Sequence, residues 1–306
     1  MEKLRIIFMG TPEFAVASLE NLLANGVQVV AVVTAPDKPQ GRGQKLDYSP
    51  VKSCALKHNL PVLQPTNLKH PHFLETLKSY RADLQIVVAF RMLPEVVWNM
   101  PRYGTFNLHA SLLPQYRGAA PINWAIINGE KETGVTTFFL QHEIDTGKII
   151  FQEKETIHDT DTVGNLYERL MKKGADLVVK TTLAIQAGNY PQTEQSETST
   201  LKSAPKIFKE TCELNWNKPA QELVNFVRGL NPYPAAWVRL AGKAFKIYQL
   251  KIVEQSKKLS VGEINTDQKN YLHVGTANGI ISIEELQPEG KRRMSIQEFF
   301  RGNKME

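Results

Sequence analysis

The fold is decided first by a stretch near the beginning of the chain, LRIIFMGTPEF at residues 4–14. Its apolar run from Leu4 to Met9 has the length and composition of a buried strand, and residues 13–25 continue as a helix. Gly10-Thr11-Pro12 forms the turn, because the fixed φ of Pro12 suits the first turn of a helix. The stretch therefore predicts a helix N-terminus at the carboxyl edge of a sheet, where open α/β sheets bind ligands.

The same alternation continues along the first half of the chain. Further strands are predicted at 27–34, 61–63, 84–90, 105–109, 135–140 and 148–155, with helices at 51–58, 73–79 and 162–187. This is the βαβ rhythm of a mostly parallel sheet covered by helices. There is no G-x-G-x-x-G motif, so a dinucleotide site is disfavoured.

Composition then divides the chain. Residues 188–203 are rich in Gln, Glu, Ser and Thr and nearly free of large apolar side chains, which is typical of an extended linker. We predict an N-terminal α/β domain at 1–187, a linker at 188–206 and a C-terminal domain at 207–306. A chain of 306 residues is long enough for one large core and a second small one.

The C-terminal domain reads as a β-rich module. A helix is predicted at 219–230, followed by short strands at 236–240, 244–253, 271–276 and 279–286. A five-stranded, OB-like β-barrel is the natural expectation, and such barrels often bind nucleic acid. Residues 205–306 hold 16 Lys and Arg against 11 Asp and Glu, most of the net charge of +6. A basic surplus on one domain favours a polyanionic partner, although plain solvated surfaces also carry one.

Other function classes are excluded by what the sequence lacks. Cys54 and Cys212 are far apart and have no Cys-x-x-Cys or Cys/His spacing, so both are interpreted as packing residues rather than a disulfide or a zinc site. His70-Pro71-His72 is interpreted as a solvated loop. No apolar run is long enough to span a membrane, and the N-terminus is no signal peptide, so we expect a cytoplasmic protein without a metal.

The chemistry concentrates in Asn107, His109 and Asp145. Residues two apart in a strand point to the same face, so Asn107 and His109 project together if the predicted strand at 105–109 is correct. Taken singly, each residue is ordinary, since a lone His is usually structural and Asp-Thr-Gly is a common turn. Together, a carboxamide, an imidazole and a carboxylate can support acyl transfer to an amine.

Residues 35–50 form a long loop with three prolines, two glycines and three cations. Loops of this length in compact domains are usually functional or disordered. Arg42 lies between Gly41 and Gly43, an unhindered position from which a guanidinium can grip phosphate. The alternative is a merely flexible surface arginine.

Several motifs spread along nearly the whole chain give it a resemblance to the methionyl-tRNA formyltransferase family. They are MGTPEFA at 9–15, the 36–52 loop with its Gly-Arg-Gly, NLH at 107–109, SLLP at 111–114, RGAAP at 117–121, DTG at 145–147, APK at 204–206 and NPYPAAW at 231–237. The Asn, His, Ser-Leu-Leu-Pro and Asp pattern specifies the formyl-transfer chemistry. The glycine-flanked Arg42 and the C-terminal module are what specify tRNA.

The resemblance implies a Rossmann-like formyltransferase domain, a C-terminal OB-like tRNA-binding domain and a cytoplasmic monomer. It also implies transfer of a formyl group from 10-formyltetrahydrofolate to the α-amino group of methionyl initiator tRNA, for translation initiation. A free amine of this type has a pKa around 8, which an adjacent ester lowers, so little base activation is needed. The barrier then lies in the tetrahedral intermediate.

Roles for individual residues follow from the resemblance. Asn107 and a protonated His109 are expected to donate hydrogen bonds to the oxyanion, and Asp145 to orient His109, favour its charged form and relay the amine proton through a water. The remaining assignments are contacts with folate for Phe90, Ser111, Leu112, Leu113 and Pro114, and contacts with tRNA for Arg42, Lys45, Lys206 and Lys209.

Three points stay open at this stage. Arg91 stands in the stretch that borders the expected pterin pocket, where relatives carry a glycine and an extra residue. Leu112 and Leu113 are equally well explained as core residues, and Arg117 either pairs with a carboxylate or positions the acceptor. Two rival functions also remain: formylation of a sugar-nucleotide amine, and binding of RNA without catalysis.

Overall fold

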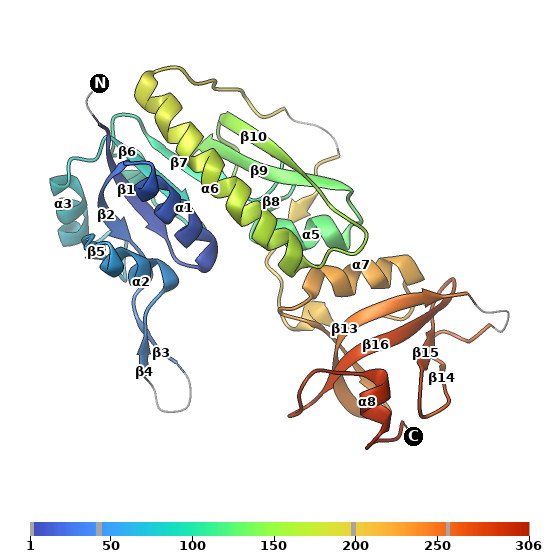
Figure 1. Ribbon diagram of the computed structural model, residues 1–306. Coiled ribbons are helices and arrows are strands. Elements are labelled where there is room, and N and C mark those ends of the chain that lie inside the picture. The colour runs from blue at the N-terminus through green and yellow to red at the C-terminus, as the bar shows by residue number, and fades with distance from the viewer. Residues whose placement is uncertain (1–2, 41–44, 197–199, 255–257, 306) are drawn as a thin grey trace. The chain divides into compact units, whose positions relative to one another are not determined.

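The structure is a computed structural model that describes residues 3–40, 45–196, 200–254 and 258–305. Its chain contacts divide it into two compact units (Figure 1). The first unit contains Met1–Gly118, Gly134–Glu155 and Glu168–Ser203, and the second contains Ala119–Thr133, Thr156–Tyr167 and Ala204–Glu306. The second unit thus includes two segments that precede the predicted 207–306 domain, and most of the predicted linker belongs to the first.

A seven-stranded sheet forms the centre of the first unit, in the order β10-β9-β7-β6-β1-β2-β5. The pairs β5·β2, β2·β1, β1·β6 and β6·β7 are parallel, whereas β7·β9 is antiparallel. This confirms the mostly parallel sheet predicted from the sequence. The strands are β1 (Arg5–Gly10), β2 (Gln28–Val33), β5 (Val62–Leu63), β6 (Leu84–Val88), β7 (Thr105–His109), β9 (Glu132–Phe139) and β10 (Ile149–Thr156).

Helices connect these strands as the periodicity predicts. They are α1 (Glu13–Ala24), α2 (Pro50–Lys57), α3 (Pro71–Ser79), α4 (Glu95–Trp98) and α6 (Val163–Ala187), of which only the short α4 was not predicted. Burial of apolar surface against the sheet holds them in place: Phe73 and Leu77 of α3 and Val97 of α4 join Ile7 and Val33 in one buried cluster. No helix in the described part of the chain combines the length and apolarity needed to cross a membrane.

The strand order reverses between β1 and β6, since β2 and β5 extend the sheet on one side of β1 and β6 and β7 on the other. Gly10 ends β1 at this switch point. A Cβ atom there would lie 2.6 Å from the Cβ of Ala15 and 2.9 Å from the carbonyl oxygen of Val88, so only glycine lets α1 start so close to the sheet. The carboxyl ends of strands beside such a switch point are the usual ligand position in open α/β sheets.

The long loop predicted at 35–50 contains regular structure that its composition does not reveal. Strands β3 (Lys38–Gln40) and β4 (Lys45–Asp47) pair antiparallel, and Ser49 caps α2 by accepting a hydrogen bond from the backbone N–H of Lys52. Arg42 lies outside the described residues. Short strands β8 (Arg117–Gly118) and β11 (Ser203–Ala204) pair with each other and were also not predicted.

The second unit is built on an antiparallel sheet of six strands, in the order β12-β13-β16-β15-β14, with β17 paired to β16. This confirms the predicted β-rich C-terminal module. The strands are β12 (Ala236–Leu240), β13 (Lys243–Val253), β14 (Ile264–Thr266), β15 (Leu272–Gly275), β16 (Ile280–Pro288) and β17 (Met294–Ser295), and the helices are α5 (Pro121–Ile127), η1 (Glu210–Cys212), α7 (Ala220–Leu230) and α8 (Ile296–Phe300).

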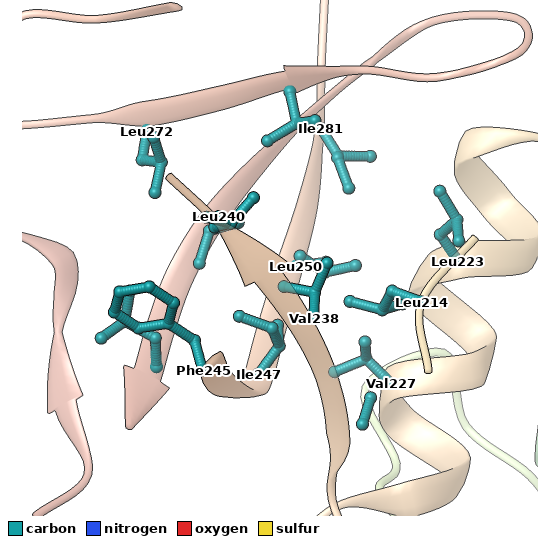
Figure 2. Packing of buried hydrophobic residues seen from close by; sticks show 14 of the residues in the cluster. Leu214, Leu223, Val227, Val238, Leu240, Phe245, Ile247, Leu250, Leu272 and Ile281 are labelled. Carbon is teal, nitrogen blue, oxygen red and sulfur yellow. The ribbon is translucent and has the colours of Figure 1, made fainter. Parts of the chain in front are cut away.

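One face of this sheet is buried against α7. Leu223 and Val227 of the helix point toward Val238 and Ile247 of the neighbouring strands, and all four are at most 3% exposed (Figure 2). Along β12 the buried residues alternate with Trp237, which is half-buried, and Arg239, which is exposed. Because strand residues alternate between faces, Trp237 and Arg239 lie on the second face of β12, outside this core.

Candidate functional site

The end of β7 brings the predicted catalytic groups together. His109 is the last residue of β7, Asn107 lies two positions earlier on the same face, and Asp145 follows β9, the antiparallel neighbour of β7. The Nδ1 atom of His109 lies 3.8 Å from Oδ2 of Asp145, and the two side chains are only 7% and 13% exposed. The sequence prediction that Asp145 meets His109 is thus confirmed.

The surroundings of the His109 ring determine where its hydrogen lies. Nε2 is 2.8 Å from the carbonyl oxygen of Tyr116, which only accepts, so Nε2 carries a hydrogen and donates it. Nδ1 faces the Asp145 carboxylate, another acceptor, at a separation beyond hydrogen-bond distance. A hydrogen must therefore lie between Nδ1 and the carboxylate, carried either by Nδ1 itself or by a donor group of a bound substrate. The ring of Phe138 meets the imidazole edge to face at 6.5 Å.

Asp145 is held in an unusual backbone conformation. Its φ of 57° lies in the left-handed region, which few residues other than glycine adopt and which is enriched at functional sites. Oδ2 accepts a hydrogen bond of 3.0 Å from the backbone N–H of Gly118. Two residues on, a Cβ atom on Gly147 would lie 1.7 Å from the carbonyl oxygen of Phe139, so the turn fits only glycine there.

Gln195 fixes this turn from the segment predicted to be a linker. Its Nε2 donates to the carbonyl oxygens of Asp145 at 2.8 Å and Gly147 at 2.9 Å. Its Oε1 accepts hydrogen bonds from Nη2 of Arg117 at 2.7 Å and from Nε of Arg117 at 3.1 Å. The partner of the Arg117 side chain, which the sequence left open, is thus the Gln195 amide. Thr193 pairs with Ile149 beside β10, so this part of the segment is docked on the first unit. A polar, apolar-poor stretch gave no signal of this role.

Asn107 differs from its neighbours because its side chain is unengaged. No residue in the described ranges forms a hydrogen bond with its carboxamide, although the residue is only half-exposed. A buried or half-buried amide normally finds a partner. The carboxamide is therefore available to a bound substrate.

The segment predicted to contact folate divides into buried and accessible residues. Ser111 is fully buried and its hydroxyl donates to the carbonyl oxygen of Gln115 at 2.6 Å, while Leu113 is 3% exposed. The peptide between Leu113 and Pro114 is cis. Leu112 and Pro114 are half-buried, which leaves these two side chains and the backbone of the segment for a ligand.

A polar network behind the segment fixes its backbone. The hydroxyl of Thr136 donates to the carbonyl oxygen of Ser111 at 2.6 Å and accepts from the N–H of Leu113 at 3.2 Å. Gln152 donates to the carbonyl oxygen of Leu113 at 2.9 Å and to the Thr136 hydroxyl at 3.0 Å. Because each member is hydrogen-bonded, the segment is held in one conformation.

Phe90 and Arg91 follow β6 at the same carboxyl edge of the sheet. Phe90 is half-buried and packs on the cluster that contains Met9 and Val87. The guanidinium of Arg91 lies 5.6 Å from the centre of the Phe90 ring and donates to the carbonyl oxygens of Pro65 and, at 3.0 Å, Thr66. The arginine thus ties the loop after β5 to the loop after β6.

The second unit carries a pocket of about 1080 Å³. It combines cations with aromatic rings on its walls: the lining includes Lys206, Phe208, Lys209, Tyr233, Trp237, Arg239 and Lys246. The sequence predicted Lys206 and Lys209 as tRNA contacts, and the structure places both in this lining. Phe208 precedes η1 and Tyr233 precedes β12, whereas Trp237 and Arg239 lie on the second face of β12, where Trp237 pairs with Lys246 of β13. Alternation along β12 was the signal that could have found Trp237 and Arg239.

The other two predicted tRNA contacts are not among the residues that line this pocket. Lys45 is the first residue of β4 in the first unit, and Arg42 falls outside the described residues.

Comparison with known proteins bears on both units. The family described as formyl transferase matches residues 3–182, and the formyl transferase C-terminal domain matches residues 206–304. The chain is 54% identical over 309 aligned residues to the methionyl-tRNA formyltransferase of Bacteroides fragilis, with 98% of this chain and 95% of that protein covered.

Two solved structures share the fold. HypX from Aquifex aeolicus, in complex with tetrahydrofolic acid, has a TM-score of 0.65 and 18% identity, covering 98% of this chain and 48% of that one. An N-formyltransferase from Helicobacter canadensis, in complex with folinic acid and dTDP-3-aminofucose, has a TM-score of 0.68 and 22% identity, covering 93% and 99%. At such identities the likeness establishes the fold alone.

Proposed function

Because the chain belongs to the methionyl-tRNA formyltransferase family, we propose that it transfers the formyl group of 10-formyltetrahydrofolate to the α-amino group of methionyl initiator tRNA. The formyl donor is of the folate type, and we propose that it is the 10-formyl form. The observation that carries the proposal is the largely buried His109–Asp145 pair beside an unengaged Asn107 carboxamide. These are the groups that acyl transfer to an amine requires.

The His109–Asp145 pair handles the proton. The amine attacks the formyl carbon, a new C–N bond forms, and the amine must lose a proton as the bond to N10 of the folate breaks and N10 regains one. The Asp145 carboxylate and Nδ1 of His109 face each other at 3.8 Å, so an amine N–H between them meets two acceptors. The pair takes the proton from the amine and returns it to N10.

Asn107 stabilises the oxyanion. Its carboxamide is a fixed donor on the same face of β7 as His109, and such donors act on charge that develops only in the transition state. We propose a role for His109 other than oxyanion donor, because its Nε2 hydrogen is already donated to the carbonyl oxygen of Tyr116. We therefore assign the oxyanion to Asn107 and the proton to the His109–Asp145 pair.

Gln195 and Arg117 are positioning residues for this centre. The carboxylate of Asp145 is aimed by a left-handed backbone conformation, which persists only where surrounding contacts hold it. The two hydrogen bonds from Gln195 to the turn and the two from Arg117 to Gln195 supply those contacts. Neither residue needs to touch the substrate.

Folate binds at the carboxyl edge of the sheet in this proposal. Phe90, Leu112 and Pro114 offer apolar surface to a flat ring, and Ser111 and Leu113 hold the backbone that a ligand meets. Arg91 maintains the wall of this site through the loop at Pro65 and Thr66.

The acceptor tRNA binds the pocket of the second unit. Phosphates of the tRNA are neutralised, without any reading of its sequence, by Lys206, Lys209, Arg239 and Lys246. Phe208 is 53% exposed and Tyr233 is 81% exposed, so unpaired bases can stack on both rings. Arg42 and Lys45 remain proposed contacts of the 36–52 loop. We also propose that the enzyme is a monomer, acts in the cytoplasm where initiator tRNA is charged, and requires no metal for the transfer itself.

An acceptor assay tests the proposal. Purified enzyme is incubated with 10-formyltetrahydrofolate and either methionyl initiator tRNA, methionyl elongator tRNA or an amino-sugar nucleotide. We expect formylation of the initiator tRNA alone or with strong preference. Transfer only to the amino sugar, or binding of tRNA with no transfer to any acceptor, would overturn it.

A further inference from the structure

Three metal-ligating side chains converge away from the proposed active site, on α1 and α2. Cys54 and His58 are four residues apart, at the end of α2, and Glu20 lies on α1, which packs against α2 (Figure 1). One ligand atom from each of the three lies within 4.8 Å of the others. Residues four apart on a helix share one face, so the cysteine and histidine point together toward α1.

We propose that Glu20, Cys54 and His58 form a binding site for Zn²⁺, which revises the interpretation of Cys54 as a packing residue alone. Sulfur, imidazole nitrogen and carboxylate oxygen are the three donor types that this ion takes in proteins, at about 2.0 to 2.3 Å. Donors in a tetrahedral shell of that radius are about 3.3 to 3.8 Å apart. Three protein ligands leave the fourth position for water.

Burial differs among the three ligands in a way that suits such a site. Cys54 is 6% exposed, whereas Glu20 and His58 are exposed. The cysteine therefore supplies a fixed anchor, and the two solvent-facing side chains can rotate to bring the three donors, which already lie within 4.8 Å of one another, to ligand spacing. The open side toward solvent also gives the ion its entry path.

The local charges set the conditions for binding. Burial raises the pKa of the Cys54 thiol, and the carboxylates of Glu20 and Glu13 on α1 raise it further while Lys57 on α2 opposes them. A cysteine binds a metal ion as the thiolate, so binding of the ion releases the thiol proton. The neighbouring carboxylates that disfavour a thiolate also favour a divalent cation.

The site has a structural consequence rather than a catalytic one. An ion bound here joins α1, which starts at the switch point, to α2, which starts after the 35–50 segment. A ligand that binds only the folded protein stabilises it, so occupancy is expected to raise the melting temperature. None of the three ligands belongs to the proposed active site.

Titration of the full-length protein with Co²⁺ tests the site, because Co²⁺ binds at zinc sites. A thiolate ligand then gives the bound Co²⁺ a strong charge-transfer band in the near ultraviolet. We expect that band to saturate at one Co²⁺ per chain and to disappear when Zn²⁺ is added. Cys54→Ser should abolish it, and His58→Gln or Glu20→Gln should weaken cobalt binding at least tenfold. These two substitutions change exposed side chains and leave the buried cysteine in place, so they test the site even if Cys54→Ser misfolds.

Matched controls are available in the chain. Cys212 is the other buried cysteine, and Cys212→Ser should keep the band, while His72→Gln removes an exposed histidine elsewhere. Zn²⁺ should raise the melting temperature of the wild type and of both controls but not of His58→Gln. Absence of a thiolate band, or a band that survives Glu20→Gln and His58→Gln unchanged, would refute the site. Chelator-treated enzyme is expected to keep its turnover.

Discussion

The end of β7 in the first unit and the pocket over β12 and β13 in the second unit use their polar residues in opposite ways. At the end of β7, His109 is buried and Asp145 is half-buried, and hydrogen bonds with Tyr116, Gly118 and Gln195 hold them in place. Around the pocket, the cations are exposed and lie beside exposed rings. Bond making needs groups fixed to a fraction of an ångström, whereas attraction to a polyanion needs charge that can adjust.

Removing the imidazole should have the largest effect and should separate the two regions cleanly. In His109→Ala, proton transfer is lost and we expect kcat to fall on the order of 10³-fold or more, with tRNA affinity unchanged. Asp145→Ala should behave similarly. Single-turnover kinetics and a separate tRNA-binding measurement give the two quantities, and His72→Ala serves as the control. Wild-type turnover in either variant would refute the assignment.

Asn107→Ala tests the carboxamide as the oxyanion donor. Loss of one such donor lowers kcat on the order of 10²-fold and leaves KM for both substrates nearly unchanged, because the interaction forms in the transition state. Steady-state kinetics with each substrate varied in turn measures the split. A variant whose KM rises while kcat stays constant would make Asn107 a ground-state binding residue instead.

Gln195→Ala is expected to misdirect Asp145 without touching the substrate. Both hydrogen bonds to the 145–147 turn are lost, and we expect kcat to fall roughly tenfold while the melting temperature changes little. The discriminating readout is the kcat profile against pH, which should change shape if Asp145 is displaced. Gln192→Ala, an exposed residue of the same segment, is the matched control, and an equal loss there would indicate a general effect of the segment.

The smallest effects are expected in the pocket, where each cation contributes little. Arg239→Ala with Lys246→Ala should raise KM for tRNA roughly fivefold, leave kcat intact and reduce the salt dependence of binding, because each phosphate contact contributes separately. Lys251→Ala, an exposed lysine on the same strand β13, is the control. A fall in kcat at saturating tRNA, with no change in the salt dependence of binding, would show that these two cations do not bind tRNA phosphates.

The two regions also differ in how far the sequence revealed them. Most strands and helices of the first unit were predicted within a few residues, because apolar periodicity reports which face is buried. Asn107, His109 and Asp145 were found through their motif, yet Gln195 was missed, because hydrogen bonds from an extended polar segment leave no periodic trace. The β3–β4 hairpin was also missed, because strands of only three residues are too short to show a periodic pattern.

The sequence by itself determined the α/β order of elements, the basic C-terminal module and the family, and it predicted which groups react, because local periodicity and short motifs encode these directly. Only the tertiary structure decided that Nε2 of His109 is committed to Tyr116, that Gln195 fixes the Asp145 turn, and that Glu20 approaches Cys54 and His58. These facts depend on distances between residues remote along the chain, and such distances are set by packing.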